Sequence, residues 1–168
     1  MGIRTTSRPL APTRWTPRLR VLVAVCSIVF TAGTAVQNFA VITPELMARS
    51  MALAGRSAAE IAAESPGFVH SLRLVGIVFI AGNALGVLAF WRRWSWLFWA
   101  ALAVNLGQAA GVVAGMVPPT VLRASIDLHG PAGVLPSLVT DGGAVLLSLI
   151  LLGFLLKYRT PWAQLRDG

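Results

Sequence analysis

The chain has 168 residues, of which 56% are hydrophobic and only 12% are charged, and its mean hydropathy is +0.73. A soluble domain contains a more even mixture of apolar and polar residues. This composition therefore excludes a soluble domain and indicates a membrane protein. The net charge of +8 does not indicate a nucleic-acid partner, because the basic residues gather at alternate ends of apolar segments.

Four apolar runs are long enough to cross a bilayer, which takes about 20 residues of helix. They are residues 21–42, 71–91, 95–117 and 132–156. We therefore predict an all-α membrane protein, a four-transmembrane-helix bundle that forms one domain over residues 21–158.

Residues 1–20 precede the first span and carry five arginines among several prolines. We predict a disordered cytoplasmic arm that is attracted to anionic lipid headgroups. A cleavable signal peptide is the alternative for the first span, because small residues at 32–35 follow an Arg-rich leader. The apolar run continues to Ile42, about 22 residues against roughly 7 to 15 in a signal core, which favours a retained helix.

The loop after the first span is predicted to contain an amphipathic interfacial helix over residues 44–64. Thr43-Pro44 has the residue types of a helix start, and Ser65-Pro66-Gly67 has those of a helix end. Most apolar side chains fall on one side of this helix and the charged ones fall opposite. We expect it to lie on the bilayer surface or to cap the mouth of the bundle, and docking of a partner is the alternative.

The charge distribution predicts the orientation of the chain. By the positive-inside rule, both termini and the turn between spans two and three are cytoplasmic, residues 159–168 form a cytoplasmic tail, and the two longer loops face outward. The expected location is the inner membrane of a bacterium. The basic residues that carry this bias are Arg4, Arg8, Arg14, Arg18, Arg20, Arg92, Arg93, Lys157, Arg159 and Arg166. A tryptophan belt is expected on the same side, from Trp91, Trp94, Trp96, Trp99 and Trp162.

Four polar side chains fall near the middle of the predicted spans: Asn83, Asn105, Gln108 and Asp141. At about 1.5 Å of rise per residue, each lies within roughly 5 Å of the midplane, and Asn105 and Gln108 share a helix face. We predict an intramembrane polar cluster. Interhelical hydrogen bonding is its expected role, and contact with a substrate is the alternative.

Asp141 is open to two geometries. We favour a continuous fourth helix that bends at Pro136, because residues 134–139 are too apolar for an exposed loop, and this places the carboxylate near mid-bilayer. In the alternative, Thr140-Asp141-Gly142-Gly143 starts a shorter helix and Asp141 is its N-cap at the outer rim. A structural role is expected for Asp141 before a role in proton or cation transport.

Glycines mark the predicted contact between spans two and three. The three-residue turn at 92–94 makes these spans an antiparallel hairpin, and glycines spaced by four let helix backbones approach closely. The residues assigned to this packing are Gly82, Gly86, Gly107, Gly111 and Gly115.

No residue pattern for catalysis is present in the sequence. It contains no nucleophile elbow, phosphate-binding loop or paired metal-binding histidines, and Cys26 is the only cysteine, which excludes paired-thiol redox chemistry. His70 and His129 are the candidates for a haem ligand pair, but their positions in or beside loops favour the absence of any cofactor or metal. We therefore expect that the chain is not an enzyme.

The leading functional prediction is a non-enzymatic accessory or scaffold component of the membrane. The alternative is a small transporter or ion-conducting subunit that uses Asp141 and the mid-membrane amides. The expected partners are the lipid bilayer and either further copies of the chain or another membrane protein. The spans, the long first outward loop and the short basic turn over residues 21–158 resemble small bacterial four-helix integral membrane proteins of the DoxX-like type. This resemblance assigns no functional residue.

Overall fold

The computed structural model describes residues 10–113 and 118–166. Three of its helical segments are long and apolar enough to cross a membrane, namely Trp15–Val41, Ala58–Phe90 and Pro119–Tyr158. The predicted helical membrane fold is confirmed at this level. The last residues of the predicted third span, with Gly115 among them, lie outside the described residues.

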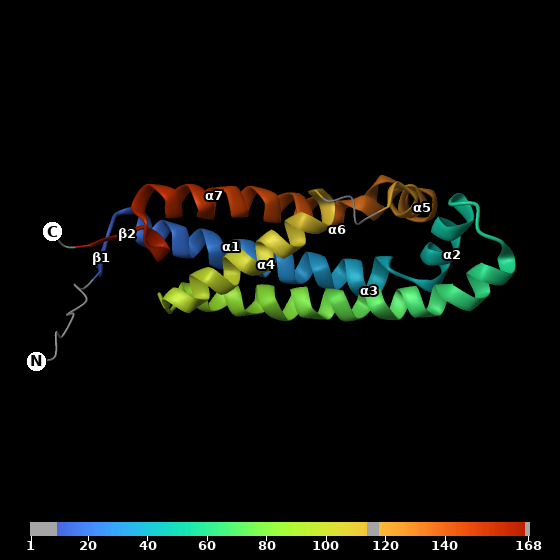
Figure 1. The fold of residues 1–168 in the computed structure, drawn as a ribbon, viewed down its shortest axis with the longest axis horizontal. Helices are drawn as coiled ribbons and strands as arrows, with labels where there is room; N and C mark the ends of the chain where they lie inside the picture. Colours follow the sequence, from blue (N-terminus) through green and yellow to red (C-terminus); the bar gives the residue numbers. More distant parts are fainter. Residues whose placement is uncertain (1–9, 114–117, 167–168) are drawn as a thin grey trace, which may run out of the picture.

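The helices form an elongated bundle (Figure 1). Its long elements are α1 (Trp15–Val36), α3 (Ala58–Gly86), α4 (Ser95–Val113) and α7 (Gly143–Tyr158), and α4 packs against both α3 and α7. We call the end that holds α2 (Pro44–Leu53) and α5 (Pro119–His129) the loop end, and the opposite end the terminal end. Shorter elements are β1 (Leu10–Pro12), β2 (Gln164–Arg166), α6 (Leu135–Ser137), 3-10 turns at Val87–Phe90, Gly130–Val134 and Pro161–Ala163, and π-helical segments at Gln37–Val41 and Leu138–Gly142.

The two ends of the described chain meet at the terminal end of the bundle. β1 pairs antiparallel with β2, with Leu10 opposite Arg166, and the Thr13 hydroxyl donates to the carbonyl of Ala163 at 2.7 Å. The prediction of a disordered arm over residues 1–20 is therefore wrong for residues 10–20. Residues 10–12 are ordered by pairing with the C-terminal segment, which neither segment can reveal alone, and residues 15–20 form the first turns of α1. Residues 1–9 lie outside the described part of the chain.

Trp162 is buried at the terminal end instead of joining the tryptophan belt. Its side chain is 0% exposed, its indole N–H donates to the carbonyl of Trp94 at 2.9 Å, and its ring meets that of Phe98 edge-on. The chain reverses through left-handed backbone conformations at Arg159 (φ 55°) and Trp162 (φ 58°), which are unfavourable for residues other than glycine. Burial of the large ring offsets that strain.

The predicted helix over residues 44–64 is two helices, so this prediction is wrong in its bounds. Thr43 caps α2 as expected, its hydroxyl accepting from the N–H of Leu46 at 3.1 Å, but α2 ends before Gly55, which has a φ of +80°. Ser57 and Glu60 then form a capping box that starts α3. Both signals stand in the sequence as Gly55 and as a Ser-x-x-Glu spacing.

Pro66 lies inside α3 and does not end it. Proline removes one backbone donor, which leaves the carbonyl four residues earlier without its helical partner. The Pro66 side chain is exposed, so that carbonyl is not sealed in the core and the break costs little. As a result, α3 continues from the loop end through the length of the bundle as one helix.

The apolar core is concentrated toward the terminal end. Side chains from α1, α4, α7 and the C-terminal turn interlock there, with Val23, Phe98, Leu151 and Trp162 at or close to zero exposure. Further along the bundle the buried residues become polar, and they include Thr34, Asn38, Asn83, Asn105, Gln108 and Thr140. The largest buried amide side chains thus lie away from the main apolar core cluster.

Candidate functional site: a polar cavity around Asp141

Gln108 is the hub of the polar cluster. Its side-chain oxygen accepts from the amide of Asn83 at 3.1 Å, and its amide donates to Asp141 Oδ1 at 3.1 Å and to the Thr34 hydroxyl at 3.3 Å. These bonds link α3, α4, α1 and the π-helical segment before α7. Three of the four residues that we predicted as a cluster, Asn83, Gln108 and Asp141, are thus brought together.

Asn105 stays outside this hydrogen-bond network. Its amide donates to the carbonyl of Ala101 at 2.8 Å, within its own helix, and its Oδ1 has no partner among the described residues. Asn105 shares a helix face with Gln108, but this does not bring it into the hydrogen-bond network, because its side-chain rotamer directs the amide back along α4. The prediction that Asn105 joins the cluster is wrong at the level of side-chain contacts.

Thr34 and Thr140 belong to the network, although the sequence reasoning left them out of the cluster. Thr34 accepts from Gln108, and the Thr140 hydroxyl lies 2.9 Å from the carbonyl of Pro136 and 3.2 Å from Asp141 Oδ1. A threonine in a helix usually satisfies its hydroxyl on the preceding turn, so sequence alone does not single it out. Only the packing of neighbouring helices identifies these two.

Asp141 lies within a helical segment and is not an N-cap. It belongs to the π-helical segment Leu138–Gly142, and Gly142 and Gly143 have helical backbone angles. Gly130, with a φ of 65°, ends α5, and from there the chain continues through 3-10, α and π segments into α7, which ends at Tyr158. The favoured geometry of a continuous, bent fourth helix is therefore the one that forms, and the alternative with Asp141 as a helix cap is wrong.

A cavity of about 390 Å³ adjoins this network. Asp141, Gln108 and Thr34 form one wall, Gln37 and Asn38 contribute from the end of the first span, and Phe79 contributes from α3. The remaining lining is aliphatic side chains of α3 and Ile42, with glycines at 76, 107 and 111. A mostly apolar hollow of a few hundred cubic ångströms with a few convergent polar groups is typical of a small-molecule site.

Two π-helical segments contribute polar residues to this cavity. Gln37 and Asn38 open the segment Gln37–Val41, and Asp141 lies in the segment Leu138–Gly142. A π turn inserts an extra residue, which disturbs the regular ladder of backbone hydrogen bonds and redirects side chains, and such turns are frequent at functional sites. Residue periodicity gives no sign of them, so the sequence analysis did not predict either one.

The loop end closes over the same region. Arg49 of α2 donates from Nε and Nη2 to Asp127 Oδ2 of α5, at 3.1 and 2.9 Å, and the hydroxyls of Ser50 and Thr120 lie 3.0 Å apart. Beneath these helices is a second cavity of about 100 Å³ that shares Gln37, Ile42 and Leu72 with the first. Helices α2 and α5 together therefore cap the loop end of the bundle.

The remaining candidate residues do not converge. His70 and His129 are both exposed, and the described residues contain no group of three or more histidine, cysteine, aspartate or glutamate side chains that could hold a metal ion. Cys26 is half-buried in α1. The chemistry of the described part of the chain is therefore concentrated at Asp141.

The predicted glycine contacts divide between several helices. A Cβ on Gly82 would lie 2.7 Å from Val104 of α4, whereas one on Gly86 would strike Ser27 of α1, so Gly86 faces a different partner from the one predicted. A Cβ on Gly107 would lie 3.5 Å from the Phe79 ring, an ordinary contact distance, so this position does not require glycine. A Cβ on Gly111 would meet no described atom within 4 Å, so the packing role predicted for it is wrong: Gly111 lines the cavity.

Gly33 provides a test of how tightly α1 packs against the π-helical segment. A Cβ there would lie 2.6 Å from the Cγ2 of Thr140, a buried β-branched side chain. We expect Gly33→Ala to lower stability by about 1 to 3 kcal/mol through overpacking. In Gly153→Ala, where no described atom is within 4 Å, alanine is expected to raise stability by up to about 1 kcal/mol. Thermal unfolding in mild detergent measures both, and equal melting temperatures would contradict the close contact.

Comparison with known proteins gives no family assignment for this chain. No protein-family model matches the chain, and no curated protein and no solved structure matches it at a significant level.

Proposed function

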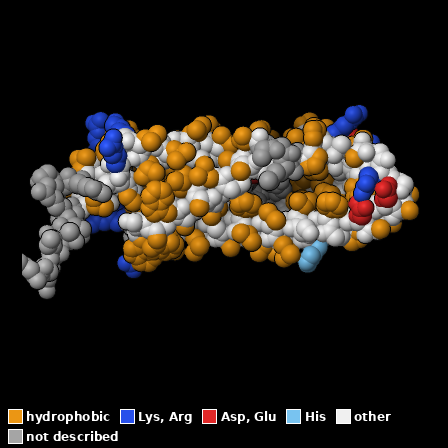
Figure 2. Space-filling view, in the orientation of Figure 1, with side chains coloured by type: hydrophobic (Ala, Val, Ile, Leu, Met, Phe, Trp, Pro, Cys, Tyr) orange, Lys and Arg blue, Asp and Glu red, His pale blue; other side chains and the backbone are white. Residues whose placement is uncertain are grey.

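We propose that this chain is a multi-pass protein of the bacterial inner membrane with four transmembrane helices. The span in addition to the three long apolar helices is α4. The described part of α4 has 19 residues, which is close to the length that a bilayer requires. An even number of spans agrees with the meeting of both chain ends at the terminal end of the bundle. Apolar side chains cover the length of the bundle in Figure 2, as lipid contact requires.

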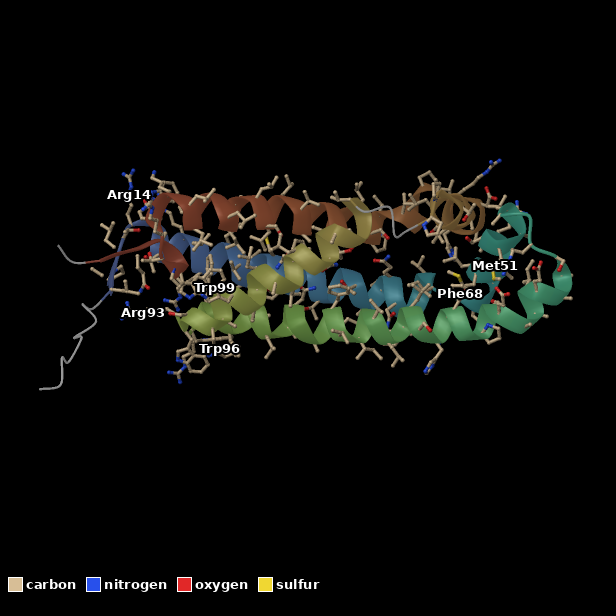
Figure 3. All side chains as sticks on the ribbon, in the orientation of Figure 1. Arg14, Met51, Phe68, Arg93, Trp96 and Trp99 are labelled. Carbon is tan, nitrogen blue, oxygen red and sulfur yellow. The ribbon has the colours of Figure 1, made fainter. Side chains whose placement is uncertain are left out.

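The distribution of charge and aromatic residues supports cytoplasmic termini. Lysine and arginine gather at the terminal end, whereas both signs of charge are present at the loop end (Figure 2). There Arg49 pairs with Asp127, and Arg56 pairs with both Glu60 and Glu64. Arg93, Trp96 and Trp99 lie near the terminal end in Figure 3, where an interfacial belt is expected, while Met51 and Phe68 lie at the loop end.

Within this membrane bundle, the proposed function is that of a small transporter or ligand-binding subunit centred on Asp141. The observation that carries the proposal is the cavity of about 390 Å³ against which the half-buried carboxylate lies. An accessory or scaffold component needs no such hollow, and ionisable groups inside a membrane usually line a pathway or a site. Passage through so small a bundle favours assembly of several copies.

The single cysteine makes this proposal directly testable. Cys26→Ala supplies a cysteine-free chain, into which Gly111→Cys places a thiol in the cavity and Leu106→Cys places one on the outer face of the same helix, where Leu106 is 41% exposed. Thiolate forms only where water reaches the sulfur. We expect a cationic methanethiosulfonate, added to proteoliposomes, to modify the Gly111→Cys thiol at least about tenfold faster than the Leu106→Cys thiol.

Comparable and negligible modification of both thiols would contradict the proposal. That result would mean that the hollow is sealed from solutes, and it would favour the scaffold role. The circular dichroism of both variants serves as the control for helical content.

A further inference from the structure

Among the described residues, the lining of the cavity includes one ionisable side chain and no counter-ion for it. Asp141 is the only aspartate, glutamate, lysine, arginine or histidine among the described residues that line the hollow. The helices packed around it offer neutral groups instead: Thr34 from α1, Asn83 from α3 and Gln108 from α4. Asp141 therefore forms no ion pair with any residue that the structure describes, so a positively charged ligand would be its natural complement.

The hydrogen-bond directions around Asp141 leave acceptors for a ligand. The amide of Gln108 is used on Asp141 and Thr34, and the amide of Asn38 donates to the carbonyl of Arg73 at 3.3 Å. Both hydrogen bonds that the Asp141 carboxylate receives end on Oδ1, and among the described residues none ends on Oδ2. The spare oxygen of Asp141 therefore favours a cation or a hydrogen-bond donor as its partner.

The rest of the lining suits an apolar body better than a hydrated metal ion. Phe79, Val75, Leu72 and Ile42 supply most of the remaining wall, whereas a hard metal ion needs about six oxygen ligands. The Phe79 ring lines the cavity, and the face of an aromatic ring attracts cations. The volume of about 390 Å³ also leaves room for a small organic molecule.

We infer that the cavity binds a lipophilic organic monocation, with its charged centre at Asp141 and its apolar groups against Phe79 and the aliphatic wall. This inference rests on the proposed function and names its ligand class. The charge supplies selectivity, and the apolar lining supplies contact area.

A matched pair of probes tests the ligand class. Benzyltrimethylammonium and neopentylbenzene have nearly the same shape and differ in the nitrogen cation that replaces a carbon atom. In proteoliposomes of the Cys26→Ala, Gly111→Cys chain, we expect benzyltrimethylammonium at saturating concentration to slow thiol modification at least about fivefold, because it occupies the space beside residue 111. Neopentylbenzene is expected to leave the rate unchanged.

Asp141→Asn is the matched variant, because asparagine keeps an oxygen that accepts from Gln108 and Thr140 while it removes the charge. We expect it to abolish protection by the cation and to leave unprotected modification of the Gly111→Cys thiol in place. Equal protection by both probes, or protection that persists in Asp141→Asn, would overturn the ligand class. Fast modification without protection by either probe would also overturn it, and in each of these cases the open cavity stands.

Failure of the proposed function has a different signature. If the Gly111→Cys thiol is modified no faster than the Leu106→Cys thiol in the absence of any probe, the cavity itself is contradicted. If Asp141→Asn does not fold, the comparison of the two probes on the chain that retains Asp141 decides the inference without it.

Discussion

Replacing Gln108 by leucine is expected to destabilise the bundle by about 2 to 4 kcal/mol. Leucine nearly preserves the side-chain volume but removes three interhelical hydrogen bonds, to Asn83, Thr34 and Asp141. Such bonds are worth roughly 0.6 to 2 kcal/mol each in a membrane. The half-buried carboxylate of Asp141 also loses the hydrogen-bond donor that Gln108 supplies. Unfolding in mixed micelles with increasing dodecyl sulfate measures the change.

Asn105→Leu is the matched control for this experiment. Asn105 lies one turn from Gln108 on the same helix and is equally buried, but its one hydrogen bond stays within α4 and its Oδ1 is without a partner among the described residues. The expected loss is below about 1 kcal/mol, because little interhelical bonding is removed. Equal losses for the two variants would contradict the view that Gln108 is the hub of the network.

Replacing Trp162 by alanine is expected to lower stability by about 2 to 4 kcal/mol. Truncation of a fully buried aromatic side chain usually costs about 3 to 5 kcal/mol, and release of the left-handed backbone at Trp162 returns part of that cost. The C-terminal segment should then loosen from α4, because the indole hydrogen bond to Trp94 and the edge-on contact with Phe98 are both lost. Thermal unfolding in mild detergent, together with the rate of proteolysis after Tyr158, measures both effects.

Two variants separate burial of Trp162 from its hydrogen bond. Trp162→Phe keeps an aromatic ring but loses the donor to the carbonyl of Trp94, and we expect a loss of about 1 to 2 kcal/mol. Trp96→Ala removes a half-exposed indole of the belt and should change stability in detergent by less than about 1 kcal/mol. If Trp162→Ala behaves like Trp96→Ala, the C-terminal segment does not stabilise the bundle.

Features that depend on a few neighbouring residues were predictable from the sequence. The N-cap at Thr43 is local, and it forms as expected. The interruption between α2 and α3 is also local, and Gly55 together with the Ser57 capping box was sufficient to predict it. We instead gave more weight to Pro66 as a helix end, and that interpretation was wrong. Proline marks a helix end only where its lost hydrogen bond is costly, and at an exposed position it is not.

The candidate site was predictable only in part, because its members are far apart in the sequence. Gln108 lies 25 residues from Asn83, 74 from Thr34 and 33 from Asp141, so helix periodicity places each near mid-membrane without saying which of them touch. The same periodicity included Asn105, whose side chain turns away. Rotation of each helix about its axis decides these contacts, and that rotation is set by packing against the neighbouring helices.

By itself the sequence determined that the chain is helical and apolar enough for a membrane, and that a carboxylate lies within its last long apolar segment. Length, hydropathy and charge depend on the chain alone, so they needed no knowledge of neighbours. Only the tertiary structure decided that two π-helical segments line one cavity and that Gln108 bonds to Asn83, Thr34 and Asp141 on three other segments. It also decided that Trp162 is buried at the terminal end. These features depend on contacts between segments that are distant in the sequence, and such contacts offset locally unfavourable backbone geometry. A local sequence pattern therefore cannot predict them.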